Sequence, residues 1–135
     1  MEAITKQYLE LFAEHSQELR ERPQLLGHYR EGAYDTFARL GLPRFKSEDY
    51  QRTDLAKLFA GDWKLLLSEG SPYWASHAFP QGIFIGSLSD FVRLYPEVAK
   101  EHYGRIASVE TDALVALNTL FAADGFVVYV PRGAK

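Results

Sequence analysis

Residues 111–131, with the sequence TDALVALNTLFAADGFVVYVP, decide the fold of this chain. Residues 111–121 place apolar side chains at helical spacing, and Asp124-Gly125 predicts a turn. Phe126–Val130 predicts a strand that is apolar on both faces. Both faces of such a strand must be covered, and its backbone groups are available to neighbouring strands. Because the chain ends at Lys135, we expect it to be the front of a larger β structure, or a module that another chain completes.

The composition indicates a soluble globular protein of one domain, or of one domain plus a fragment. Of the 135 residues, 47% are hydrophobic and 24% are charged. The net charge is −3 and the basic residues are scattered, whereas sequence-independent nucleic-acid binding needs a clustered basic face. No apolar run approaches the roughly 20 residues that span a bilayer, and no secretory signal is recognisable. We expect a cytoplasmic protein that binds neither nucleic acid nor membrane.

The sequence offers no recognisable active site or metal site. It contains no cysteine, which excludes thiol catalysis and thiolate-held metals or iron–sulfur clusters within these residues. The histidines are dispersed, and none lies three or four residues from another, as a helical metal pair requires: they are His15, His28, His77 and His102. We therefore expect no catalytic residue, no cofactor-binding residue and no metal ligand in this chain.

Two helices are predicted in the first 40 residues. The first apolar stripe recurs at spacings of three and four and comprises Ile4, Tyr8, Leu11, Phe12, His15 and Leu19. Arg22-Pro23 ends this helix, because the residue before a proline avoids helical angles. A second stripe runs from Leu26 to Leu40, and Gly41-Leu42-Pro43 stops it. Helices joined this closely are expected to fold back as a hairpin, stripe against stripe.

The middle of the chain predicts short elements. Ser47 and Thr53 can each cap a short turn of helix. Residues 63–81 have an irregular pattern, which predicts a loop with one short strand near Leu65–Leu67. A short buried strand follows at Ile83–Ile85.

Two further helices follow that strand. Ser87, with Asp90 three residues later, has the spacing of a capping box and opens the first of them. Pro96 begins the second, because proline suits the first position of a helix. This helix is expected to end near Tyr103-Gly104. The residues alone thus predict an α+β, mainly helical protein.

Three segments resemble a known family. Residues 41–55, GLPRFKSEDYQRTDL, resemble a segment near the N-terminus of SufD, a branch of the SufB/SufD family of iron–sulfur cluster assembly scaffold proteins. Residues 82–88, followed by Tyr95-Pro96-Glu97 and His102-Tyr103-Gly104, resemble a second segment. Residues 116–133 resemble the entry of that family into its core. The segments occur in the family's order and cover about two thirds of the chain.

The chain departs from the family pattern at two places. Tyr50 stands where the family often has tryptophan, and Arg52 stands where it often has tyrosine. Residues 63–81 are also short for the family, so this stretch is either natively trimmed or lacks intervening residues.

The resemblance implies an N-terminal helical domain that leads into a right-handed β-helix. Residues 1–104 would be the helical domain, with a short strand near 83–86. Residues 105–135 would supply a helix and the first strand, 126–130, of a β-helix core that is truncated here. The resemblance also implies a non-enzymatic subunit that works with a SufB-type scaffold and the SufC ATPase. The iron–sulfur cluster would belong to the full complex, and the family's cluster and ATPase-docking positions lie downstream, so no site residue is transferred.

Two other interpretations remain open. The chain could be a free-standing helical adaptor that uses its first helix for protein interaction. A small hydrolase is the third interpretation, and it would need Ser76 and His77, or two other histidines, to converge in a pocket. We further expect the strand 126–130 to be hidden, either by pairing with another copy in a homo-oligomer or by packing against the chain's own helices.

Overall fold

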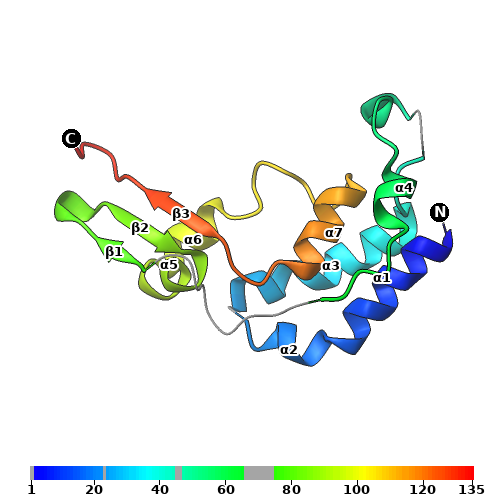
Figure 1. Ribbon diagram of the computed structural model, residues 1–135. Coiled ribbons are helices and arrows are strands. Elements are labelled where there is room, and N and C mark those ends of the chain that lie inside the picture. Colours follow the sequence, from blue (N-terminus) through cyan, green and yellow to red (C-terminus); the bar gives the residue numbers. More distant parts are fainter. Residues whose placement is uncertain (1, 23, 45–46, 66–74) are drawn as a thin grey trace.

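Two groups of elements form separate hydrophobic cores in the computed structural model, which describes residues 2–22, 24–44, 47–65 and 75–135. We call them the helical lobe and the sheet lobe. Figure 1 shows the two lobes side by side, with the N-terminus at the far end of the helical lobe and the C-terminus at the far end of the sheet lobe. The predicted α+β, mainly helical class is confirmed.

The helical lobe combines the first part of the chain with one late helix. Its elements are α1 (Glu2–Glu14), α2 (Ser16–Arg20), α3 (Gln24–Leu40), the 3-10 helix η1 (Glu48–Tyr50), α4 (Leu55–Phe59) and α7 (Ala113–Phe121). The sheet lobe contains β1 (His77–Ala78), the 3-10 helix η2 (Pro80–Gly82), β2 (Phe84–Ser87), α5 (Leu88–Leu94), α6 (Pro96–His102) and β3 (Phe126–Tyr129).

The core of the helical lobe lies between α1, α3 and α7. Its most extensive helix–helix contact joins α3 to α7, and α1 packs beside them (Figure 1). The buried members of the core are Tyr8, Ala33, Phe37, Leu42, Ala113, Ala116, Leu117 and Leu120. The predicted α1–α3 hairpin is present, but α3 uses most of its buried face for a helix more than 70 residues further along the chain.

The first helix is shorter than the sequence predicts. The apolar stripe predicts one helix up to Arg22, whereas α1 ends at Glu14 and His15 leaves helical geometry with φ −102° and ψ 9°. The break reorients α2 so that Leu19 is fully buried and its carbonyl oxygen accepts a hydrogen bond from Arg30 at 2.7 Å. This tertiary contact overrides the local periodicity.

The ends of the helices test the predicted caps. Gly41 has φ +63°, and its N–H donates to the Phe37 carbonyl, which confirms the stop after α3. Ser47 stands at the N-cap position of η1, as predicted, whereas the cap predicted at Thr53 is wrong. The Ser47 side chain makes no capping bond, and Asp54 instead caps α4 by accepting from the Lys57 N–H. Aspartate directly before Leu55 places its acceptor one residue closer to the helix than Thr53 could.

The sheet has the order β1-β2-β3, and both pairs are antiparallel. Ile85 lies opposite His77 on one side and Val128 on the other. The predicted strand at 83–85 is confirmed with a shift to Phe84–Ser87. Residues 63–81 are not entirely loop, because β1 and the start of η2 fall within them. The strand predicted near Leu65–Leu67 cannot be assessed, because Leu66 and Leu67 lie outside the described residues.

Helices α5 and α6 cover one face of the sheet. Ser87 caps α5 by accepting from the Asp90 N–H at 3.1 Å, and Pro96 stands at the start of α6, as predicted. The core between helices and sheet is an aromatic cluster around Phe84, Phe91, Tyr95 and Tyr129, whose ring centroids lie 5.2–5.8 Å apart. No helix of the described chain is long and apolar enough to cross a lipid bilayer.

Candidate functional site

The face of the sheet that points away from α5 and α6 is apolar and exposed. In β3, Val127 and Tyr129 point inward and pack against the aromatic cluster. Their neighbours alternate to the other side, where Phe126, Val128 and Val130 are 53–58% exposed. Because Ile85 lies opposite Val128, it extends the same face onto β2. We call these four residues, together with the exposed Phe79, the outer sheet face.

The strand β3 also forms an edge of the sheet, since the sheet order ends with it. Soluble proteins rarely leave a flat apolar strand uncovered at an edge, because it invites pairing with other strands. The expectation that this strand is hidden is thus met on one face only. The covered face is the one that packs against the sheet lobe's own helices, and the outer sheet face is a candidate interface.

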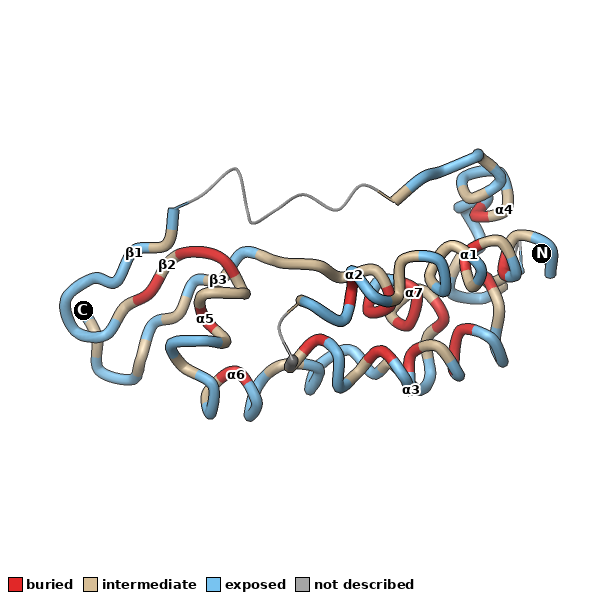
Figure 2. The backbone as a smooth tube through the Cα atoms, turned by 90° about the horizontal axis from the view of Figure 1, so that it is seen from below, coloured by how far each residue is buried: buried red, intermediate tan, exposed pale blue. Residues whose placement is uncertain are grey.

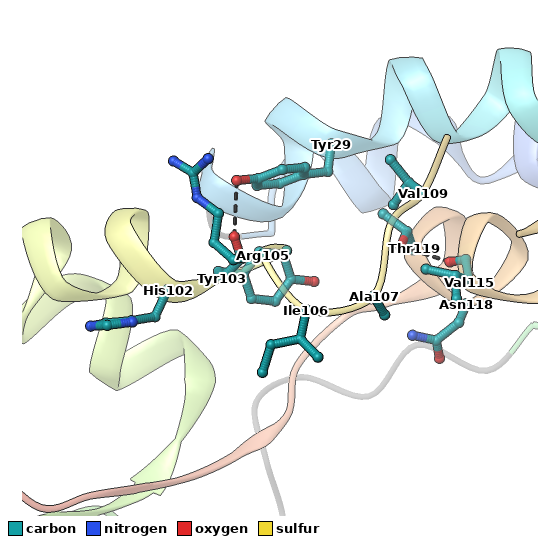
Figure 3. A pocket seen from close by; sticks show the side chains of 11 residues that line it. Tyr29, His102, Tyr103, Arg105, Ile106, Ala107, Val109, Val115, Asn118 and Thr119 are labelled. Carbon is teal, nitrogen blue, oxygen red and sulfur yellow. Dashed lines mark hydrogen bonds between the residues drawn. The ribbon is translucent and has the colours of Figure 1, made fainter. Parts of the chain in front are cut away.

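A cavity of about 300 Å³ lies between the two lobes (Figure 3). Tyr29 of α3 forms one wall, the segment 102–109 another, and Val115, Asn118 and Thr119 of α7 the third. The Tyr29 hydroxyl donates to the Tyr103 carbonyl at 3.0 Å. Figure 3 shows the side chain of Ile106 pointing away from Tyr29, and Ile106 is fully exposed.

The groups that line this cavity do not form a catalytic set. Burial raises the pKa of the Tyr103 hydroxyl above its ordinary value, so Tyr103 stays protonated and is not a base. The Thr119 hydroxyl donates to the Val115 carbonyl within α7. The volume also lies at the lower limit for small-molecule sites. The cavity therefore reflects imperfect packing where the lobes meet more than a reaction site.

Arg30 of α3 joins α2 to the end of α7 inside the helical lobe. Arg30 is 5% exposed, and its two terminal nitrogens donate to the carbonyls of Leu19 and Ala122. Burial lowers the pKa of the guanidinium from its ordinary value, against the opposing influence of Tyr103 and together with that of Arg22. Ala122 begins the connection from α7 to β3, so Arg30 fixes the point at which the chain leaves the helical lobe for the sheet.

Ser76 and His77, the residues that a hydrolase would need, do not work together. The Ser76 hydroxyl donates to the Asp90 carboxylate at 2.6 Å and accepts from the Ser87 N–H at 3.1 Å. His77 is exposed on β1, where its ring lies 6.2 Å from that of Phe79. Ser76 instead holds the start of β1 against β2, so closely that a β-carbon at Gly86 would lie 2.3 Å from its hydroxyl.

No metal centre is apparent in the part of the chain that the structure describes. There, no group of three or more histidine, cysteine, aspartate or glutamate side chains is arranged to hold an ion. His15 bonds to Glu18 at 3.2 Å on the surface. The expectation that the chain carries no cofactor, metal or catalytic residue stays a prediction from the sequence.

The segments that carry the family resemblance serve as structural junctions. In the segment 41–55, the Leu42 N–H donates to the Thr5 hydroxyl, and the Tyr50 hydroxyl donates to Asp112 at 3.2 Å. Asp112 also caps α7 by accepting from two backbone N–H groups, at 2.7 and 3.0 Å. In the turn before β3, Asp124 accepts from the Ser89 N–H at 2.9 Å and thereby joins β3 to α5.

Comparison with known protein families finds a match over nearly the whole chain. The family described as SufBD protein N-terminal region matches residues 2–72 and 70–135. The two matches meet at residues 70–72, inside the stretch 63–81 that looks short for the family.

Individual relatives point to the same family. The iron–sulfur cluster assembly SufBD family protein ABCI9 of Arabidopsis thaliana is 32% identical over 54 residues, which is 40% of this chain and 12% of that protein. The chloroplastic protein ABCI8 of the same family and plant is 30% identical over 54 residues, which is 40% of this chain and 10% of that protein. The SufBD family protein slr0074 of Synechocystis is 23% identical over 101 residues, which is 75% of this chain and 20% of that protein.

These matches span only 10–20% of the length of the curated relatives. No solved structure matches the chain. The family match, however, covers far more than half of the residues. The chain therefore belongs to the SufB/SufD protein family, and its residues correspond to the N-terminal region of that family.

Proposed function

We propose that this chain is the N-terminal domain of a SufD-like scaffold subunit in the SUF complex for iron–sulfur cluster assembly. Its role is structural: it positions the rest of the scaffold and does not catalyse a reaction. The partners would be a SufB-type scaffold and the SufC ATPase, in the cytoplasm, and the cluster would be held elsewhere in the complex. The single observation that carries the proposal is the family match over residues 2–72 and 70–135.

The exposed outer sheet face supports the proposal that this chain is one domain of a larger protein. Three of its residues, Phe126, Val128 and Val130, are apolar and yet more than half exposed. We propose that β3 is the first strand of a β-helix whose later strands cover this face and pair with the edge of β3. Covering an apolar face gains about 25 cal/mol for each Å² removed from water. A homo-oligomer that pairs two copies through residues 126–130 is the alternative way to cover it.

The adaptor interpretation receives less support from the first helix. Tyr8 of α1 is buried in the helical core, and Phe12 packs against that core beside Tyr34 and Phe121. The apolar stripe of α1 is thus already used within the chain. Its outer face carries charged residues such as Lys6 and Glu10, which form an exposed ion pair at 3.5 Å. Such a face lacks the apolar anchors of a helix-in-groove interaction.

Affinity purification from the native cells tests the assignment. The tagged protein should copurify with a SufB-type subunit and a SufC-type ATPase, and its depletion should lower the activity of iron–sulfur enzymes. Purification without either partner, together with unchanged iron–sulfur enzyme activities, would contradict the proposal.

An activity screen tests the structural role separately. Generic esters should not be turned over, because Ser76 is bonded to Asp90 and not to a histidine. Turnover that is lost in His77→Ala would favour the hydrolase interpretation instead.

A further inference from the structure

The end of the helical lobe opposite the sheet carries a groove between α1 and the segment that stops α3. Its volume is about 470 Å³. Figure 1 shows the N-terminal end of α1 beside the C-terminal end of α3, at the end of the molecule remote from the C-terminus. We call the groove between α1 and the segment 40–44 the hairpin-end groove. It does not belong to the outer sheet face or to the cavity between the lobes.

Leu9, Leu40 and Pro43 supply apolar surface to the lining of this groove, and we call this apolar part the floor. Leu9 of α1 and Pro43 are half-buried there, and Leu40, the last residue of α3, is 42% exposed. A large aliphatic side chain at a helix end, exposed to this degree, can still bury apolar surface against a ligand. The floor can therefore accept one apolar side chain.

The rim of the groove is basic. Lys6, Arg39 and Arg44 line it, and Glu2 is the acidic residue among the lining side chains. Each of the three cations is exposed. Lys6 forms an ion pair with the exposed Glu10 at 3.5 Å. One nitrogen of Arg39 donates to the Glu110 carbonyl at 3.1 Å, and the other N–H groups of Arg39 remain available to a ligand. The three cations outnumber Glu2 and Glu10, so the groove carries a small positive excess on a chain whose net charge is −3.

The groove is formed before any ligand arrives. The Leu42 N–H donates to the Thr5 hydroxyl, which joins α1 to the stop segment, and Leu42 itself is 3% exposed. Gly41 has φ +63°, and a β-carbon there would lie 3.2 Å from the Thr5 hydroxyl, so the turn fits only glycine well. A preformed groove lowers the ordering cost of binding.

We propose that the hairpin-end groove binds an acidic peptide segment of a partner protein, with one leucine or phenylalanine side chain on the floor and carboxylates at Lys6, Arg39 and Arg44. The combination of an apolar floor and a basic rim on an otherwise acidic protein selects this class of partner through charge complementarity. The partner's affinity would be modest and would fall as salt rises, since the cations are exposed. This site adds an interaction to the proposed scaffold role and does not depend on it.

Titration with a synthetic peptide tests the site. The probe is acetyl-Glu-Asp-Leu-Phe-Glu-Asp-Glu-amide, and the readout is the amide spectrum of the ¹⁵N-labelled 135-residue chain. The expected shifts cluster in residues 2–9 and 38–44, and binding weakens at least about tenfold between 20 mM and 200 mM salt. A matched peptide with serine at the Leu and Phe positions should bind at least about tenfold more weakly.

Variants of the chain separate this groove from general charge attraction. Arg44→Glu and Leu40→Ser should each weaken binding of the acidic peptide about tenfold or more. Arg132→Glu, an equal charge reversal at the far end of the molecule, should leave it unchanged. Equal binding of the serine peptide, shifts outside the groove, or no effect of Arg44→Glu would overturn the proposal. Equally tight binding of a 12-nucleotide single-stranded DNA in the groove would also overturn it in favour of a polyanion site.

Discussion

The helical lobe and the sheet lobe bury their apolar residues in different ways. The helical lobe encloses Phe37 and Leu120 completely between α1, α3 and α7. The sheet lobe packs an aromatic cluster against one face of its sheet and leaves Val128 on the other face 58% exposed. Figure 2 shows this contrast, with buried backbone clustered along α3 and α7 and exposed backbone along β1 and the outer part of the sheet. The core of the helical lobe is enclosed on all sides by its own helices, whereas the sheet of the sheet lobe is covered on one face only.

The largest effect is expected from a cavity in the self-contained core. Phe37→Ala should lower the free energy of unfolding by about 3–5 kcal/mol, because Phe37 is fully buried and its removal leaves a void. Chemical denaturation measures the loss. The matched control is Phe126→Ala, which removes the same side chain from the outer sheet face and should cost less than about 1 kcal/mol. Equal losses from both variants would remove the distinction between the lobes.

The buried contact by which Arg30 holds the end of α7, where the chain leaves for the sheet lobe, should be next in size. Arg30→Met removes the donors to the Leu19 and Ala122 carbonyls but keeps the apolar part of the side chain. We expect a loss of about 1–3 kcal/mol, because the Ala122 carbonyl loses the Arg30 donor, whereas the Leu19 carbonyl still accepts from the Arg22 N–H. Hydrogen exchange at Gly125, whose N–H donates to the Asp124 carboxylate, should become faster, since Ala122 is no longer held.

A matched arginine isolates this role. Arg39→Met also removes a donor to a carbonyl, that of Glu110, but on the surface, and should change stability by less than about 0.5 kcal/mol. Unchanged exchange at Gly125 in Arg30→Met would show that Arg30 does not hold the start of the connection from α7 to β3.

Two helix caps, that of α7 in the core and that of the peripheral helix α4, should contribute unequally to stability. Asp112→Ala removes the acceptor for two backbone N–H groups of α7 and for the Tyr50 hydroxyl, and should cost about 1–2 kcal/mol. Asp54→Ala removes one such acceptor at the exposed start of α4 and should cost about 0.5 kcal/mol. Thermal unfolding ranks the two. A larger loss from Asp54→Ala would contradict the central place of α7.

The smallest effect is a pH dependence in the sheet lobe. The Ser76 hydroxyl, and then Arg93, hold the pKa of Asp90 below its ordinary value. Because the folded-state pKa is the lower one, this stabilisation is present above about pH 4 and is lost as the pH falls through the folded-state pKa. Its size should be below about 1 kcal/mol, since the Asp90 side chain is 39% exposed and screened by water. Ser76→Ala should raise the pKa of Asp90 in a carbon-detected titration, and an unchanged pKa would contradict the assigned cause.

The sequence predicts those elements that local chemistry controls. Ser87 and Pro96 mark helix starts, and Gly41 marks a helix stop, because each acts on its own turn. The break at His15 is not visible in the periodicity, since it depends on the contact between Leu19 and Arg30. The strand β1 is likewise hidden, because two residues carry no alternation and only the pairing of His77 with Ile85 defines it.

The two candidate interfaces differ in how far the sequence predicts them. An apolar β3 is evident from residues 126–130, but which face is covered depends on the packing of Val127 and Tyr129 against α5 and α6. The hairpin-end groove cannot be read from the sequence at all. Lys6, Arg39 and Arg44 are scattered along the chain and only the α1–α3 hairpin brings them together.

The central claim, that the outer sheet face is an unfinished interface, can be tested directly by thiol labelling, because the chain contains no native cysteine. Val128→Cys places a thiol on the outer sheet face, and Val127→Cys places one on the adjacent, inward-facing position as the control. Maleimide should react quickly with Val128→Cys in the isolated chain and at least about tenfold more slowly in the proposed scaffold complex, whereas Val127→Cys should react slowly in both. Equally fast labelling of Val128→Cys in the chain and in the complex would contradict the account.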